Sequence, residues 1–243
     1  MSKPKITYSV ITVPRKEPYL LNLVENLKTT GFFADSKNLP LRLVAGSPDC
    51  SYLLSYSDPE MFLVDPMGYE EAKKTSWGIA GLALRATMGH RRCLDQNRVN
   101  PGSSYILVME DDIKFADGWI VRFSEILEEA ISVYSNRFIL SLYTPGSPTP
   151  LDAYRSGKKW ILRSHSEFYG VQAVLFPLAV RDEFMKESTE RPTFLPHDLS
   201  LGKVLGKLGI PILSTAPCLV QHVGRVSSAE CAWHDSKSFL EHL

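Results

Sequence analysis

The sequence predicts an α/β protein, in which a mixed, mainly parallel sheet is flanked by helices within one domain. Short apolar runs typical of strands alternate along the chain with segments whose apolar residues recur at helical spacing. The 243 residues are 44% hydrophobic and 22% charged, the composition of an ordinary globular protein. No repeat, low-complexity segment or linker interrupts the chain. We therefore expect one domain over residues 1–239, followed by a tail or tag remnant over residues 240–243.

In the first half of the chain, the expected elements follow a strand-then-helix order. The apolar run Ile6–Val13 predicts the first strand, and Pro14 ends it. Apolar residues between Leu20 and Leu27 then recur at helical spacing, and Gly31 stands where a helix commonly ends. The other elements expected here are strands at Leu41–Ala45 and Met61–Val64 and a long helix at Glu70–Gln96.

In the second half, Ser104–Met109 predicts a buried strand that runs directly into three acidic residues. The apolar residues from Trp119 to Tyr134 predict an amphipathic helix, with Asp117 as its N-cap. Thr144–Pro150 is rich in proline, glycine and serine, so an irregular loop is expected there. The remaining expected elements are strands at Phe138–Tyr143, Trp160–Leu162 and Val171–Phe176 and a short helix at Asp198–Leu208.

Charge, hydropathy and cysteine spacing exclude several classes of protein. The 27 basic and 27 acidic residues cancel, so no general attraction to polyanions is expected, although a local basic groove could still bind DNA. No apolar stretch approaches the roughly 18 residues that suggest a membrane-spanning helix, and we expect a cytoplasmic protein. The four cysteines form no CxxC pair, which argues against a zinc ribbon and predicts four reduced thiols, at Cys50, Cys93, Cys218 and Cys231.

Three adjacent carboxylates, Glu110, Asp111 and Asp112, follow the strand predicted at Ser104–Met109. In an open α/β sheet, ligands bind in the crevice beyond the carboxyl ends of the strands. Three neighbouring carboxylates repel one another unless a cation or hydrogen bonds offset the repulsion, and Mg²⁺ or Mn²⁺ favours such oxygen ligands. The alternative is a solvated acidic turn that caps the following helix.

Two later segments also carry residues suited to chemistry. Asp198 stands at the expected start of a helix, where it could act as an N-cap or present a general base. His222 follows an apolar run, where it could be a structural histidine or a metal ligand. Gly224 would allow the backbone to approach a bound group closely.

Taken together, three segments resemble a known family. They are Val10–Arg15, Tyr105–Ile113 (YILVMEDDI) and Pro217–Ser228 (PCLVQHVGRVSS). Their order is similar to that of GT-A glycosyltransferases, and most closely to the N-acetylglucosaminyltransferase IV type. The segment from Pro196 to Gly202 also resembles the Glu-Asp-x-x-Leu-Gly element of many inverting transferases, except that His197 replaces the first acid.

The resemblance implies a role for each matching residue. Thr12, Pro14 and Arg15 would line the nucleotide pocket, with Arg15 available for phosphate. The other implied roles are ribose and sugar contacts for Glu110 and Asp111, divalent-metal ligation by Asp112 and His222, a position beside the donor sugar for Gly170, and general-base catalysis by Asp198, for which Glu167 is an alternative.

The implied function is metal-dependent transfer of a sugar from a UDP-sugar to an acceptor hydroxyl, with inversion. The metal would be Mn²⁺ or Mg²⁺, and N-acetylglucosamine is one candidate sugar. The acceptor could be a glycan, a small metabolite or hydroxymethylated DNA, and a bacterial or viral enzyme is the easier interpretation. A nucleotidyltransferase is one alternative, although Val13–Lys16 is not a glycine-rich phosphate loop. A catalytically inactive glycan- or nucleotide-binding module is another.

Overall fold

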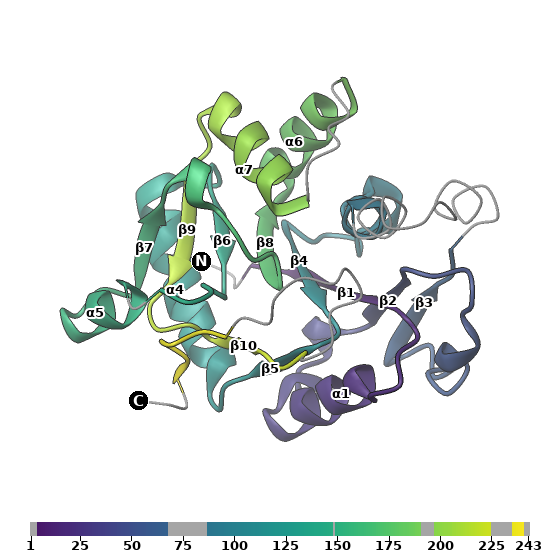
Figure 1. The fold of residues 1–243 in the computed structure, drawn as a ribbon. Coiled ribbons are helices and arrows are strands. Elements are labelled where there is room, and N and C mark those ends of the chain that lie inside the picture. The colour runs from purple at the N-terminus through teal and green to yellow at the C-terminus, as the bar shows by residue number, and fades with distance from the viewer. Residues whose placement is uncertain (1–3, 68–86, 148, 191–196, 225–234, 241–243) are drawn as a thin grey trace.

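The computed structural model describes residues 4–67, 87–147, 149–190, 197–224 and 235–240. Its main feature is an eight-stranded sheet in the order β3-β2-β1-β4-β8-β6-β9-β7 (Figure 1). Its strands are β1 (Ile6–Thr12), β2 (Leu41–Ala45), β3 (Phe62–Asp65), β4 (Tyr105–Glu110), β6 (Ile139–Ser141), β7 (Trp160–Arg163), β8 (Ala173–Pro177) and β9 (Ile212–Thr215). A separate ribbon pairs β5 (Ile113–Phe115) with β10 (Val220–His222). The helices are α1 (Tyr19–Thr29), α4 (Trp119–Tyr134), α5 (Thr149–Arg155), α6 (Leu178–Glu190) and α7 (His197–Leu208), and residues 87–93 are also helical.

The sheet has two halves that differ in strand direction. In one half, β3, β2, β1 and β4 all run parallel. In the other half, β8 is antiparallel to both β4 and β6, β6 is parallel to β9, and β7 is antiparallel to β9. The molecule is therefore a mixed α/β structure with a large sheet flanked by helices, as the sequence predicts.

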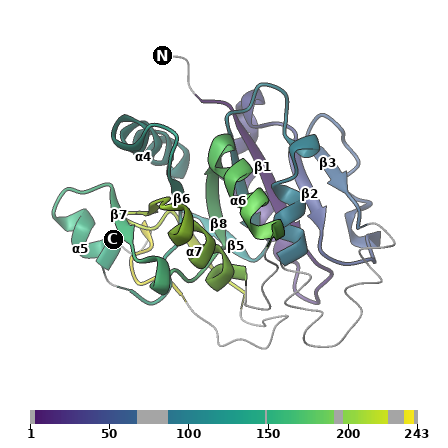
Figure 2. The ribbon, with the colours of Figure 1, turned by 90° about the horizontal axis from the view of Figure 1, so that it is seen from above.

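β1 and β4 lie in the middle of the sheet and are covered on both faces. Along β4, Tyr105, Leu107 and Met109 belong to one hydrophobic core, and Ile106 and Val108 belong to the other. This alternation follows from the two-residue period of a strand that is buried on both faces. Helices α1 and α4 pack in the first core, and α6, α7 and residues 87–93 pack in the second (Figures 1 and 2).

The sequence locates most strands to within one or two residues, and Leu41–Ala45 matches β2 throughout. Three expectations need correction. The N-cap of α4 is Gly118 and not Asp117, because the backbone there is left-handed (φ 69°), a conformation that glycine adopts without strain. Thr144–Pro150 is not irregular throughout, because α5 begins at Thr149; Pro150 lies in the first turn, where its missing N–H costs nothing. Of the predicted helix Glu70–Gln96, residues 70–86 lie outside the described residues, and the helical part ends at residue 93.

Besides α5, one helix and three strands were not expected from the sequence: α6, β5, β9 and β10. Cys50, Cys93 and Cys218 are free thiols as predicted, and Cys231 lies outside the described residues. Leu240, the first residue of the expected tail, donates its N–H to the carbonyl of Cys218 (3.0 Å) and packs against the core. Within the described ranges, no helix combines the length and apolar character needed to cross a membrane.

Candidate functional site

The strand order reverses between β1 and β4. The chain runs outward from β1 to β2 and β3 and returns on the other side of β1 as β4. Ligands of open α/β sheets bind beyond the carboxyl ends of the strands at such a point. β1 and β4 are parallel and pair Ile11 with Glu110, so the residues that follow each strand lie at the same edge. The structure thus brings Thr12 and Arg15 together with Glu110, Asp111 and Asp112, three residues that we call the acidic cluster. Pro14, predicted to line the nucleotide pocket, is exposed beside them.

Asp111 is the buried anchor of the acidic cluster. Its Oδ2 accepts the hydroxyl of Thr12 (2.7 Å) and the N–H of Val13 (3.3 Å), and its Oδ1 lies 3.1 Å from Nη2 of Arg15. The hydroxyl of Tyr52 in turn donates to the carbonyl of Thr12 (2.8 Å), which fixes the end of β1. Burial nevertheless raises the pKa of Asp111 to about 6, despite the opposing charge of Arg15.

Asp112 contacts two partners through one oxygen. Its Oδ2 accepts from Nη1 of Arg15 at 2.8 Å and lies 3.4 Å from Nε2 of His222. Its Oδ1 is buried and has no hydrogen-bond partner among the residues that the structure describes. Burial alone would raise the pKa of Asp112, but hydrogen bonds and charge from His222 and Arg15 lower it overall. The carboxylate is therefore ionised, and within the described part of the chain one of its oxygens has no partner.

The ribbon of β5 and β10 carries His222 to this carboxylate. His222 pairs with Ile113 in the ribbon, and the N–H of Val223 donates to the carbonyl of Asp112 (2.9 Å). Gly224 follows, and a Cβ added there would lie 2.4 Å from Oδ2 of Asp112. Only glycine fits this close approach without a shift of Asp112. The sequence suggested an approach to a bound group at Gly224, and the structure shows an approach to Asp112. Arg225, Ser227 and Ser228 of the same predicted motif lie outside the described residues.

Glu110 lies on the other side of the cluster, against the second half of the sheet. Its Oε2 accepts from Nε2 of Gln172 (3.3 Å), its backbone N–H donates to the carbonyl of Gln172 (2.9 Å), and its Oε1 lies 3.7 Å from Nε2 of His90. Burial, followed by the charge of Asp112, raises the pKa of Glu110 to about 7. Glu110 is therefore the member of the cluster that most readily holds a proton near neutral pH.

His90 and His197 form a buried pair beside Glu110. Their rings stack with centroids 4.0 Å apart, and burial lowers the pKa of both, that of His90 to about 3. Both imidazoles are therefore neutral, and neither Nε2 has a hydrogen-bond partner among the described residues. The stack joins the helical residues 87–93 to the first residue of α7. It places the start of α7 near the end of β4.

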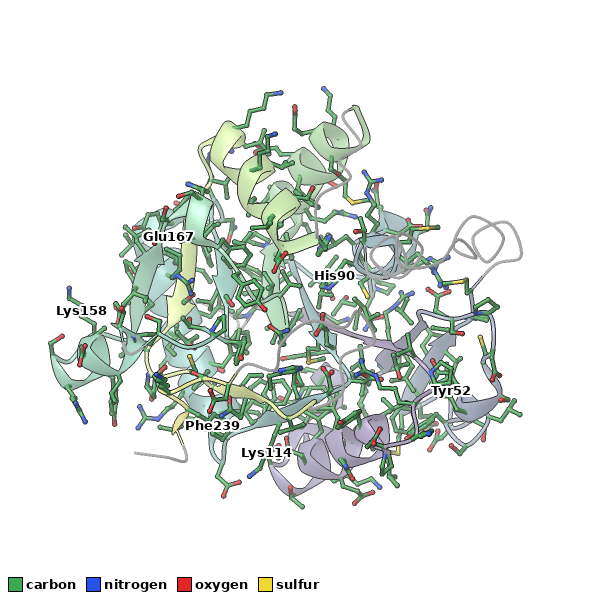
Figure 3. All side chains as sticks on the ribbon, in the orientation of Figure 1. Tyr52, His90, Lys114, Lys158, Glu167 and Phe239 are labelled. Atoms are coloured by element: carbon green, nitrogen blue, oxygen red, sulfur yellow. The ribbon has the colours of Figure 1, made fainter. Side chains whose placement is uncertain are left out.

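Asp198 is the second residue of α7, directly after His197. Its Oδ1 accepts the N–H of Leu199 (2.8 Å), so it satisfies an amide of the first turn while remaining partly accessible. Glu167, the alternative base, is exposed in the 3₁₀ turn His165–Glu167. In Figure 3 the labelled Glu167 lies on the β7 side of the sheet and the labelled His90 on the β4 side. The stack of His197 on His90 thus places the residue directly before Asp198 beside the neighbour of Glu110, whereas Glu167 lies farther from His90 in this view.

Gly170 shapes the wall that contains Gln172. Its φ of +90° is one that residues with a Cβ rarely adopt, and a Cβ there would lie 3.0 Å from Oε1 of Gln172 and 3.1 Å from Pro145 and Tyr143. Because β8 runs antiparallel to β4, the segment before β8 reaches the carboxyl end of β4. Gly170 therefore acts through the tight turn that leads to Gln172, and Gln172 is the residue that contacts Glu110.

Sequence reasoning missed three residues of the site: His90, Gln172 and Tyr52. A signal for His90 was present in its neighbour Gly89, where a Cβ would lie 2.9 Å from the side chain of Ile11, so the helix packs closely on β1. The position of Gln172 depends on the direction of β8, and Tyr52 reaches Thr12 from the 3₁₀ turn Ser51–Leu53. No local sequence pattern predicts the contact of Gln172 with Glu110 or that of Tyr52 with Thr12.

Asp112 and His222 are the residues that could hold a metal ion. In the described part of the chain, no three His, Cys, Asp or Glu side chains converge to enclose an ion by themselves. Mg²⁺ and Mn²⁺ do not require such a cage, because they are commonly held by one or two protein ligands together with substrate phosphates. The unpartnered Oδ1 of Asp112 and the neighbouring imidazole of His222 fit this kind of site. No protein-family model matches the chain, and no curated protein matches it significantly.

Proposed function

We propose that the protein is a metal-dependent glycosyltransferase of the GT-A type, which transfers a sugar from a UDP-sugar to an acceptor hydroxyl with inversion. The observation that carries the proposal is the acidic cluster at the β1–β4 reversal, where, among the described residues, Arg15 is the arginine paired with two of the three carboxylates. The cluster lies where nucleotides bind in doubly wound sheets of strand order 3-2-1-4. Its excess negative charge favours a divalent cation, and the cation in turn favours a diphosphate.

The nucleotide side of the site would be formed by β1 and the segment after it. Asp112 and His222 would hold Mn²⁺ or Mg²⁺, and such an ion neutralises the charge that develops on a leaving diphosphate. Arg15 is close enough to the same carboxylates to contact that diphosphate as well. Thr12 and the N–H of Val13 hold Asp111 in place, so the wall of the pocket is rigid where the nucleotide would lie.

The sugar side would be formed by Glu110 and its neighbours. Around its carboxyl group lie Gln172 and the two neutral imidazoles, His90 and His197. The Oε1 of Gln172 and the Nε2 atoms of both histidines have no hydrogen-bond partner in the described structure. Buried polar atoms are normally paired, so such a group of neutral donors and acceptors favours a ligand rich in hydroxyl groups.

The acceptor side would lie at the start of α7. An acceptor hydroxyl is a weak nucleophile, and a positioned carboxylate can take its proton during attack. Asp198 is the carboxylate of α7 nearest in sequence to the His90–His197 pair, and it is partly accessible. If it acts from the side opposite the leaving diphosphate, one displacement inverts the anomeric carbon. The acceptor could be a glycan, a metabolite or hydroxymethylated DNA, and transfer assays with each class of acceptor would identify it.

The test combines binding and turnover. UDP binding is measured by calorimetry with Mn²⁺ and with EDTA, and UDP release is measured over a panel of sugar nucleotides. We expect Mn²⁺-dependent UDP binding that Asp112→Asn abolishes, and release that falls by about 10²-fold or more in Asp198→Asn while UDP binding is retained. Asn keeps the capping ability of Asp, so Asp198→Asn is expected to fold.

UDP binding that is equal in EDTA and Mn²⁺ would contradict the metal site. Turnover near the wild-type value in Asp198→Asn would leave Asp198 with a capping role only. Pyrophosphate release from a nucleoside triphosphate, with no release from UDP-sugars, would identify a nucleotidyltransferase. UDP binding with no turnover on any donor would identify a binding module.

A further inference from the structure

We propose that Arg15 is the resident counter-cation of the acidic cluster, and that the divalent ion replaces it only when a nucleotide diphosphate is present to receive the arginine. The inference rests on the proposed function and adds that metal and nucleotide bind cooperatively. Each would favour the release of Arg15 from Asp112 and so tighten the binding of the other.

The geometry shows that Arg15 occupies the position of a cation. Its two terminal nitrogens contact Oδ1 of Asp111 (3.1 Å) and Oδ2 of Asp112 (2.8 Å), so one guanidinium bridges the two carboxylates. The Asp112 oxygen that Arg15 contacts is also the one that lies 3.4 Å from His222. A metal ion held by Asp112 and His222 would therefore share its ligands with a positive charge at contact distance. Like charges that close repel strongly in a partly buried site, so the two cations exclude each other.

The chain also gives Arg15 room to leave. It lies in the segment between β1 and α1, outside both elements, and its side chain is 16% exposed. Its guanidinium lies 5.3 Å from the ring centroid of Tyr19, the first residue of α1, which offers a second surface through a cation–π contact. The Nε atom of Arg15 has no hydrogen-bond partner among the described residues. Arginine also binds phosphate in a two-pronged geometry, so a diphosphate can replace the carboxylates as its partner.

Linkage makes this exchange measurable without turnover. If a nucleotide diphosphate removes Arg15 from Asp112, then UDP tightens Mn²⁺ binding, and Mn²⁺ must tighten UDP binding by the same factor. Neutralising Arg15 has two opposite effects. Mn²⁺ alone binds more tightly because its competitor is gone, and UDP contributes less because its arginine partner is gone.

The experiment titrates Mn²⁺ into the full chain with and without UDP and follows free Mn²⁺ by electron paramagnetic resonance. For Mn²⁺ alone, we expect Arg15→Gln to bind about tenfold more tightly than the wild type, within the usual range of coupling between sites. With UDP present, the gain in Mn²⁺ affinity is expected to be about tenfold smaller in Arg15→Gln than in the wild type. Arg15→Lys keeps the charge and is expected to bind Mn²⁺ alone as the wild type does.

Arg137→Gln is the matched control, because Arg137 forms an ion pair with Glu183 (2.6 Å) on an exposed surface, and its loss should change neither value. If Arg15→Gln does not fold, Asp111→Asn/Arg15→Gln is compared with Asp111→Asn alone, and the same tightening is expected. Unchanged Mn²⁺ affinity in the Arg15 variant, with normal joint binding of Mn²⁺ and UDP in the wild type, overturns the exchange alone. A wild-type chain that does not bind Mn²⁺ even with UDP overturns the proposed function and this inference together.

Discussion

Two clusters of charge lie at the same edge of the sheet, and they are opposites. In the acidic cluster of Glu110, Asp111 and Asp112, Arg15 contacts two of the three carboxylates, Asp111 and Asp112. At the end of β3, three arginines instead surround one carboxylate, Asp65: Arg92 lies 2.9 Å away, Arg42 lies 3.9 Å away, and Arg98 is in contact. We call this second group the arginine cluster.

The two clusters differ in whether the charged groups in excess form hydrogen bonds with the backbone. In the arginine cluster, the Nη atoms of Arg92 donate to the carbonyls of Ala45, Asp65 and Pro66, so its charge ties the ends of β2 and β3 to residues 87–93. In the acidic cluster, Oδ1 of Asp112 has no comparable bond to the backbone among the residues that the structure describes. An unpaired atom by itself does not distinguish the two clusters, because Nε of Arg42 in the arginine cluster also lacks a partner among the described residues. A charged side chain that is bonded to the backbone, such as Arg92, indicates a structural role. A buried carboxylate oxygen without a partner among the described residues, such as Oδ1 of Asp112, indicates a ligand-binding role.

The largest expected effect tests the structural side of this comparison. Asp65→Asn leaves buried arginines without a carboxylate and is expected to lower the free energy of unfolding by about 3–5 kcal/mol. Asp112→Asn removes a charge that Arg15 and His222 stabilise but leaves Arg15 paired with Asp111, so it is expected to lower the free energy of unfolding by only about 1–2 kcal/mol. Urea unfolding at pH 7 measures both. Equal losses in the two variants would contradict the distinction between the clusters.

A smaller effect tests whether geometry, as well as charge, defines the acidic cluster. Gly224→Ala adds a Cβ 2.4 Å from Oδ2 of Asp112, which must shift that carboxylate. We expect Mn²⁺-dependent UDP binding to weaken by about tenfold, or about 1.4 kcal/mol, with all charges unchanged. Gly118→Ala is the control, because a Cβ there meets nothing within 4 Å and causes only backbone strain at φ +69°. Calorimetry that gives equal UDP affinity for both variants would exclude a geometric role for Gly224.

The last test concerns pH and the neutral imidazole beside Glu110. Burial lowers the pKa of His90 to about 3, so as pH falls the unfolded chain takes up this proton first. The contribution of His90 to stability is therefore present above about pH 6.5 and is lost towards pH 3, by up to about 1.4 kcal/mol per pH unit. His90→Phe keeps a ring against His197 and should remove that loss. Urea unfolding from pH 7 to pH 4.5 gives the difference between the two profiles, and parallel profiles would contradict the prediction.

The sequence was sufficient for the parts of the fold that depend on local pattern. The strand at Ser104–Met109, the helix after Trp119 and the acidic residues between them follow from apolar periodicity and from the abrupt change to charge. The assembly of Asp112 with Arg15 and His222 was anticipated only through resemblance, since these residues are far apart in the chain. The structure brings the three side chains into contact.

What the sequence could not show depends on strand direction and on pairing over long separations. Gln172 reaches Glu110 because β8 runs antiparallel to β4, and no local pattern sets that direction. The short strands β5 and β10 pair with each other outside the main sheet, and three residues each are too few for periodicity to be read. His90 was overlooked because the helix that contains it suggested only a structural role.

The β5–β10 ribbon also determines at which stage of synthesis and folding the candidate site becomes complete. The last strand of the main sheet, β9, ends at Thr215, so the crevice between β1 and β4 can form from what precedes that residue. His222 reaches Asp112 only when β10 pairs with β5, and β10 follows β9 in the chain. During synthesis, the strands of the main sheet are therefore all made before His222, the second residue proposed to bind the cation. Under the proposed function, the site is complete only after β10 has left the ribosome and paired with β5.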